Sequence, residues 1–104
     1  MFVVIYEFKA KSGLENEFID AWYEVTKGIY TEMGSLGSRL HSNETTGKFI
    51  AYAQWPDRNA WQKETRFSNQ SFVDASEKMK KTIESIKILH ELDVLSDYLH
   101  DVKY

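Results

Sequence analysis

Apolar and polar residues alternate along two stretches of this chain, which is the period of a β-strand. The first stretch runs from Phe2 to Lys9 and the second from Phe49 to Trp55. In the second stretch one face carries Phe49, Ala51, Ala53 and Trp55, and the other face carries Ile50, Tyr52 and Gln54. Neither face is polar enough to lie against water, so we expect this strand to be covered on both sides.

The segment between residues 36 and 61 predicts a hairpin followed by the start of a helix. Residues 36–41 alternate, and the polar residues 42–48 join them to the strand that begins at Phe49. Pro56 cannot donate to a sheet ladder, so this strand should stop at Trp55. Asp57 is a suitable N-cap for a short helix that carries Ala60 and Trp61.

Two longer segments have helical spacing. Ser12 and Glu15 form an S-x-x-E capping box, which predicts that a helix begins near Gly13. The apolar stripe of this helix consists of Leu14, Phe18, Ala21, Trp22, Val25 and Ile29. A second stripe consists of Phe72, Ala75, Met79 and Ile83. A last strand is expected near residues 88–95, and the tail to Tyr104 either forms one helical turn through Tyr98 and Leu99 or frays.

This order of elements predicts one α+β domain over residues 1–104. Strand, helix, strand, strand, helix, strand is the split βαβ or ferredoxin-like arrangement, a four-stranded antiparallel sheet with the helices on one face. The other face would expose an apolar patch larger than soluble monomers usually carry. We therefore expect a homodimer in which two sheets pair face to face.

Composition excludes several classes of partner. The formal net charge is −3 with acidic and basic residues interspersed, which predicts neither nucleic-acid nor membrane binding. No apolar run approaches the roughly 20 residues of a membrane span, and the N-terminus lacks the features of a signal peptide. Cysteine is absent. These features together predict a cytoplasmic protein without thiol chemistry.

The candidate chemistry centres on histidine. The chain has three histidines, His41, His90 and His100, and no two of them have metal-ligand spacing, so we expect no metal site. His41 ends the strand that the hairpin places beside the strand of Trp55. Its ring is therefore either a general base at a cleft or a structural side chain.

A cleft and a filled core remain equally open at this point. Ala51 and Ala53 remove bulk from one sheet face, and the helices above it carry Phe18, Trp22, Trp61 and Phe72. Small residues below aromatic ones leave space for a flat apolar pocket. They also allow Trp22 to pack directly on the sheet.

With these elements in place, the sequence SLGSRLHSNETTGKFIAYAQWPDRNAW resembles the antibiotic biosynthesis monooxygenase domain, a dimeric α/β barrel family. The resemblance extends over the whole chain, and its specific part is YAQW followed by a polar turn and an aromatic residue. Members of that family include cofactor-free oxygenases that convert phenols or quinols into quinones, haem-degrading enzymes, and proteins without an established reaction.

The resemblance implies site residues. Trp55 and His41 match a tryptophan and a histidine of the quinone-forming members, Trp61 replaces a tyrosine, and Ala51 replaces an asparagine expected to touch the substrate. The positions used by the haem-degrading members hold Tyr6, Glu64 and Ser76 here, so the resemblance implies no haem and no other cofactor.

Two functions are consistent with these residues. The first is a cofactor-independent monooxygenase that oxidises a phenol, quinol or anthrone with O₂. In it His41 and Trp55 are catalytic, His41 by proton transfer and Trp55 by stacking, and Tyr6, Trp22, Ala51, Trp61 and Phe72 bind substrate. The second is a non-enzymatic dimer that binds a small apolar ligand or has a structural role, as the loss of a polar group at Ala51 would favour.

Overall fold

The computed structural model describes residues 1–63 and 66–99, so Glu64 and His100 lie outside the described part. The elements in chain order are β1 (Phe2–Ala10), α1 (Glu15–Glu32), β2 (Gly37–Asn43), β3 (Lys48–Trp55), α2 (Arg58–Gln62), α3 (Gln70–Thr82) and β4 (Ile83–Asp93).

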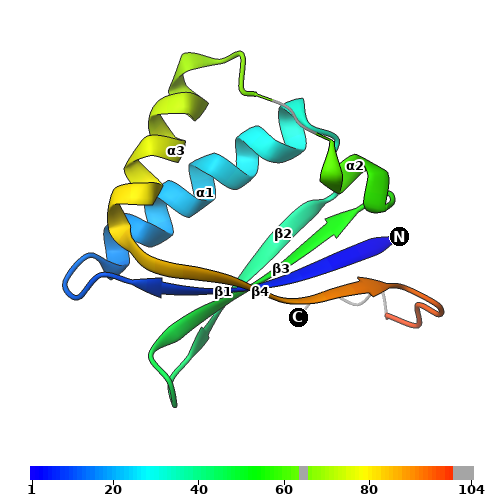
Figure 1. Cartoon of the computed structure of the whole chain (residues 1–104), viewed down its shortest axis with the longest axis horizontal. Helices are drawn as coiled ribbons and strands as arrows, with labels where there is room; N and C mark the ends of the chain where they lie inside the picture. The colour runs from blue at the N-terminus through cyan, green and yellow to red at the C-terminus, as the bar shows by residue number, and fades with distance from the viewer. Residues whose placement is uncertain (64–65, 100–104) are drawn as a thin grey trace.

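The strands form one antiparallel sheet in the order β2-β3-β1-β4. Phe2 pairs with Trp55, and Tyr6 pairs with Ala51. Helices α1 and α3 cover one face, and α2 lies at the end where β3 stops and β1 begins (Figure 1). We call this the helix-covered face and the opposite one the open face. The ferredoxin-like α+β prediction is confirmed.

Local signals explain where β3 ends and α2 starts. The strand stops at Trp55, before Pro56, and Asp57 accepts a hydrogen bond from the backbone N–H of Ala60 at 2.8 Å. Both predictions for this segment are therefore confirmed. Asn69 caps α3 in the same way by accepting from the N–H of Ser71 at 2.9 Å.

The predicted capping box and the predicted start of the last strand were wrong. The capping box at Ser12 does not form, because Leu14 is the N-cap of α1 and has no side-chain cap. Glu15 instead accepts the N–H of Gly13, whose φ of 83° places it in the left-handed turn that glycine tolerates. The last strand begins at Ile83 rather than near Ile88. It follows Thr82 directly, because Ile83 already pairs with Ala10.

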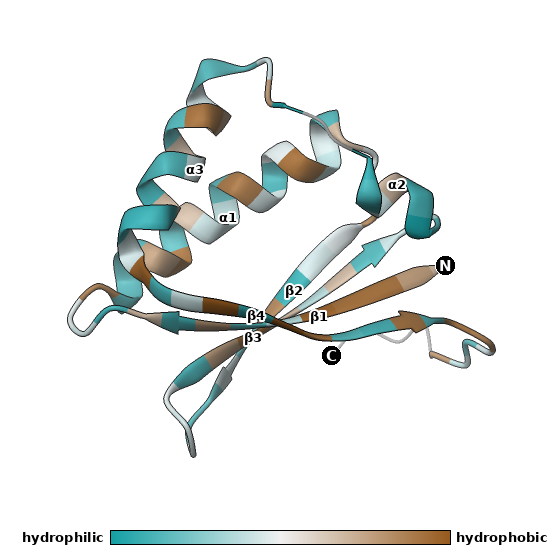
Figure 2. Ribbon diagram, in the orientation of Figure 1, coloured by the Kyte–Doolittle hydropathy of each residue, from teal (hydrophilic) through white to brown (hydrophobic). Residues whose placement is uncertain are grey.

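The core lies between the helices and the sheet, in two clusters. The first contains the buried residues Phe2, Val4, Ala53 and Trp55, and the second contains Phe8, Phe18 and Ala51. Figure 2 shows the hydrophobic colour on the N-terminal half of β1 and in stretches of β4, whereas much of α3 is hydrophilic. Among the described residues, no helix is both long and apolar enough to cross a membrane.

Candidate functional site

Trp55 lies in the filled part of the helix-covered face. It is only 6% exposed and packs with Phe2, Val4 and Ala53. Its indole Nε1 is buried and finds no hydrogen-bond acceptor in the described part of the chain. The side chain expected to stack on a substrate is thus enclosed by protein.

Tyr6 on β1 and Trp61 on α2 pack against the same cluster as Trp55. The indole Nε1 of Trp61 donates to the phenol oxygen of Tyr6 at 2.8 Å, and the Trp61 ring packs 5.6 Å from that of Phe2. Burial raises the pKa of the Tyr6 phenol above its ordinary value, the hydrogen bond from Trp61 lowers it in part, and the carboxylate of Glu91 adds to the increase. Tyr6 is therefore a neutral hydrogen-bonding group at physiological pH.

The helix-covered face is also packed at Ala51. Ala51 is 2% exposed and lies in the cluster of Phe8 and Phe18, so aromatic rings occupy the space above it. Phe72 is elsewhere, between α3 and α1. A Cβ added at Gly28 would come within 2.7 Å of its ring, which shows how closely the two helices approach there.

An open groove lies between α1 and the edge strand β2. Its volume is about 530 Å³, within the size range of small-molecule sites. Its apolar walls come from Ile19, Trp22 and Tyr23 on α1, Leu40 on β2 and Phe49 on β3. Trp22 is half-buried and also packs against the second core cluster, whereas Tyr23 is exposed. The groove can thus accept a flat apolar molecule beside Trp22.

His41 lies at the edge of this groove and is exposed. Its Nδ1 is 3.0 Å from the carbonyl oxygen of Ile50. A carbonyl can only accept, so Nδ1 carries the hydrogen and Nε2 of the neutral ring keeps its lone pair. This hydrogen bond leaves Nε2 as the nitrogen that can take up a proton.

The structure therefore brings together some of the predicted site residues and separates others. Trp22 and His41 share the groove with Phe49. Trp55 is at the other end of β3, because His41 pairs with Ile50 while Trp55 pairs with Phe2. Tyr6, Ala51, Trp61 and Phe72 belong to the packed interior. Whether any of these residues acts on a substrate stays a prediction.

Sequence reasoning missed the outer wall of the groove. Ile19 and Tyr23 both lie beyond the Trp22 side of the predicted α1 stripe, so helical spacing alone assigned them to the solvent face, and they are 38% and 58% exposed. Tyr23 follows Trp22 directly, and this aromatic pair was the available signal. Within residues 1–63 and 66–99, no group of three or more His, Cys, Asp or Glu side chains could hold a metal ion.

The four-stranded antiparallel sheet with its helices on one face defines a ferredoxin-like α+β protein, and comparison with known proteins narrows this class. The sequence profile described as antibiotic biosynthesis monooxygenase matches residues 1–68. The chain belongs to the antibiotic biosynthesis monooxygenase family. No curated protein sequence matches it significantly.

Solved structures have the same fold at low sequence identity. One described as an antibiotic biosynthesis monooxygenase is 17% identical with a TM-score of 0.68, covering 92% of this chain and all of that one. A mutant of SnoaB, a cofactor-independent oxygenase from Streptomyces nogalater, is 11% identical with a TM-score of 0.70, covering 95% and 97%. PA3566 from Pseudomonas aeruginosa is 20% identical with a TM-score of 0.67, covering 91% and 94%.

Proposed function

We propose that this protein is a cofactor-independent monooxygenase that oxidises a small electron-rich aromatic, a phenol, quinol or anthrone, with O₂. The observation that carries the proposal is the groove between α1 and β2, which has aromatic walls and the basic nitrogen of His41 at its edge. Membership of the antibiotic biosynthesis monooxygenase family supports the reaction type.

Such a substrate supplies its own electrons. For an anthrone, His41 Nε2 takes a proton from the ring CH₂, and the resulting carbanion combines with O₂ to form a C–O bond. The peroxide anion takes the proton back from the imidazolium. The hydroperoxide then loses its remaining C–H proton and hydroxide as water, while the O–O bond breaks and the carbon becomes a carbonyl. One O₂ thus yields one quinone and one water.

The groove residues have separate roles in this proposal. Trp22 and Phe49 hold the aromatic ring flat in the groove, with its reacting carbon at the outer edge of β2, where the His41 ring reaches it from the open-face side. Trp55, Trp61, Tyr6, Ala51 and Phe72 belong to the packed interior in this proposal. Their substitution would then act through the amount of folded protein rather than through a lost contact with the substrate.

We also propose a homodimer that pairs two open faces. Ile50 and Tyr52 on β3 and Ile5 on β1 are half-buried on this face, with no helix above them. His41 pairs with Ile50, so its ring lies on the same side of β2. A second copy placed there would shield the His41 side of the groove from water.

The test is oxygen uptake by the purified, metal-free protein with a panel of small anthrones and quinols. We expect uptake above the autoxidation blank, with one O₂ consumed per quinone formed. His41→Gln and Trp22→Ala should remove most of it, while His90→Gln serves as the matched histidine control. Trp55→Ala should reduce uptake only in proportion to the folded protein that is lost.

A second candidate function is ligand binding without oxidation. The observation in its favour is that His41 is the one imidazole or carboxylate side chain among the described residues lining the groove, so no acid assists it. Quenching of Trp22 fluorescence by a quinone, without any oxygen uptake from the matching quinol, would favour this function. Loss of quinone binding in Trp22→Ala, measured by equilibrium dialysis, would assign the ligand to the groove.

A further inference from the structure

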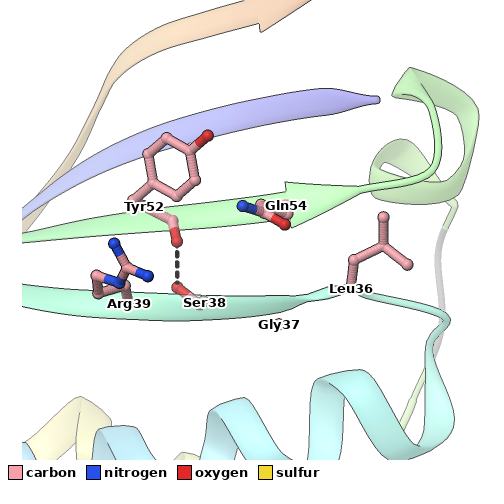
Figure 3. Close-up of a pocket in the computed structure, with 6 residues that line it drawn as sticks. All are labelled: Leu36, Gly37, Ser38, Arg39, Tyr52 and Gln54. Atoms are coloured by element: carbon pink, nitrogen blue, oxygen red, sulfur yellow. Dashed lines mark hydrogen bonds between the residues drawn. The ribbon is translucent and has the colours of Figure 1, made fainter. Parts of the chain in front are cut away.

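Arg39 lies between two hollows of the structure. It lines the groove between α1 and β2, and it also lines a smaller hollow of about 230 Å³ at the start of β2 and the end of β3 (Figure 3). Ser38 is shared by both as well. Because the two hollows adjoin at this edge of the sheet, one ligand can occupy the groove and extend into the smaller hollow.

The smaller hollow presents hydrogen-bond donors to a ligand. Arg39 pairs with Tyr52 in the register, and Gln54 is two residues further along β3, so the three side chains lie on the open face. Ser38 Oγ donates to the backbone carbonyl of Tyr52 at 2.9 Å and not to its phenol. Within residues 1–63 and 66–99, Arg39 takes part in none of the ion pairs. A guanidinium, a phenol and an amide can all donate to one anion.

The size and charge of this hollow favour a carboxylate. Its volume is below the range of about 300–1,000 Å³ typical of small-molecule sites, so it suits a substituent rather than a whole ligand. No Asp or Glu is among the described residues that line it or the groove. Asp97 lines a separate hollow with Tyr52 and forms no ion pair with Arg39 within the described part of the chain. A carboxylate can accept two parallel hydrogen bonds from one guanidinium, which fixes its position.

The register relates this anion site to the proposed base. Arg39 and His41 are two residues apart on β2, so their side chains leave the strand on the same side, about 7 Å apart. A ligand that meets both would carry its carboxylate at a similar distance from the carbon that gives up a proton. One benzene ring with neighbouring substituents is too short for this spacing. A fused-ring substrate with the carboxylate on an outer ring spans it.

We infer that the substrate of the groove is an acidic fused aromatic, whose carboxylate binds Arg39 in the smaller hollow while its rings lie beside Trp22 and Phe49. This inference rests on the proposed function and names the substrate class within it. Arg39 then sets the specificity, since a neutral aromatic of the same shape makes only the groove contacts. In the proposed homodimer the second copy would lie over the open face, and its exclusion of water would strengthen the pairing of carboxylate and guanidinium.

Binding of matched stable compounds tests the inference apart from the reaction. Anthraquinone-2-carboxylate and anthraquinone-2-carboxamide have the same rings and differ in charge, and neither is a substrate for the proposed oxidation. Equilibrium dialysis with the original chain should give a dissociation constant about tenfold lower for the carboxylate, because charge-assisted hydrogen bonds are gained. Equal affinities, or no binding of either compound, would overturn the inference.

Substitutions then assign the preference to Arg39. Arg39→Gln should weaken carboxylate binding about tenfold and bring the two dissociation constants to within about twofold of each other. Arg39→Lys should keep part of the preference, since it keeps the charge and loses the two parallel hydrogen bonds. Lys27→Gln, at an exposed position of α1 outside both hollows, is the control for total charge. A preference that survives Arg39→Gln, or that Lys27→Gln removes equally, would contradict the assignment.

The outcomes separate this inference from the proposed function. Oxygen uptake is compared for anthrone-2-carboxylate and the matching carboxamide, and kcat/KM should be higher for the carboxylate. Uptake from both anthrones at equal kcat/KM, with no preference in binding, refutes the inference and leaves the monooxygenase standing. A binding preference that depends on Arg39, without uptake from either anthrone, refutes the reaction and supports recognition of an acidic aromatic at the same site.

Discussion

The helix-covered face of this protein has two aromatic-rich ends that differ in packing. At one end Trp55 is only 6% exposed, and Trp61 and Tyr6 pack against its cluster. At the other end Trp22 and Phe49 border a groove of about 530 Å³. Both ends lie on the same strand, β3, and both carry tryptophan. The presence of aromatic residues therefore does not distinguish a pocket from a core.

The difference arises from what lies above each end. The short helix α2 follows β3 directly and places Trp61 over Phe2, where its indole also reaches Tyr6. At the other end the sheet stops at the edge strand β2, and α1 is the helix that borders it. A sheet edge with one helix beside it leaves room that a helix directly above the sheet removes.

The strongest test of this comparison is truncation of one tryptophan at each end. Trp55→Ala should lower the free energy of unfolding by about 3–5 kcal/mol, because it leaves a cavity in the packed cluster. Trp22→Ala should cost about half as much, since its ring is only half-buried. Urea unfolding followed by circular dichroism measures both. Equal losses would mean that the two ends are packed alike.

A smaller effect is expected from the hydrogen bond that closes the filled end. Tyr6→Phe leaves the Trp61 Nε1 without its acceptor in a partly buried place and should cost about 1–2 kcal/mol. Adding Trp61→Phe removes the unpaired donor, so the double variant should lose less than the two single losses together. Strict additivity in this cycle, measured by thermal unfolding, would show that the bond contributes nothing.

The N-cap of α2 should contribute less to the free energy of unfolding than this hydrogen bond does. Asp57→Ala removes the acceptor of the Ala60 N–H and should cost about 1 kcal/mol. Asn69→Ala removes the equivalent cap of α3, which is distant from Trp61, and should cost a similar amount. Asp57→Ala alone should change tryptophan fluorescence in the folded state. If Asn69→Ala causes the same change in fluorescence, the change does not come from an effect of the α2 cap on Trp61.

The smallest expected effect on stability comes from Glu32, which lies outside both ends of the helix-covered face, and it depends on pH. The side-chain hydroxyl of Ser68, and then the backbone N–H groups of Ser68 and Asn69, donate to Glu32 and lower the pKa of its carboxyl. Because the folded pKa is lowered, this contribution is present above the ordinary glutamate pKa and is lost as pH falls through the folded value.

Glu32→Gln should remove that contribution while leaving the filled end and the groove unchanged. The difference in melting temperature between the original chain and Glu32→Gln should therefore be largest at neutral pH and shrink at acidic pH. A difference that is independent of pH between 3 and 7 would show that the carboxylate makes no net contribution.

Local signals in the sequence were sufficient for most of the fold. Pro56 ends β3 and Asp57 starts α2 because their effects involve neighbouring residues alone. The capping box at Ser12 failed for a reason that is also local, since Gly13 turns the chain and Glu15 accepts the Gly13 N–H from inside the helix. The start of β4 at Ile83 was missed because pairing with Ala10 outweighs the helical spacing of the same residue.

The candidate site was predictable in part. Trp22 and His41 were both expected to face a ligand, and both line the groove. Trp55, Trp61 and Phe72 were expected there too, but they pack against other parts of the chain. A residue pattern gives the face on which a side chain lies, and it gives no information on which neighbour fills the space above that face.

The sequence by itself determined the strands, the two long helices, their antiparallel order and the family, because alternation, helical spacing and turn residues act over short distances. The tertiary structure decided which end of the helix-covered face is filled and which is open. It also set the tautomer of His41 through the Ile50 carbonyl. These features depend on contacts between residues far apart in the chain, and such contacts exist only after the helices have packed on the sheet.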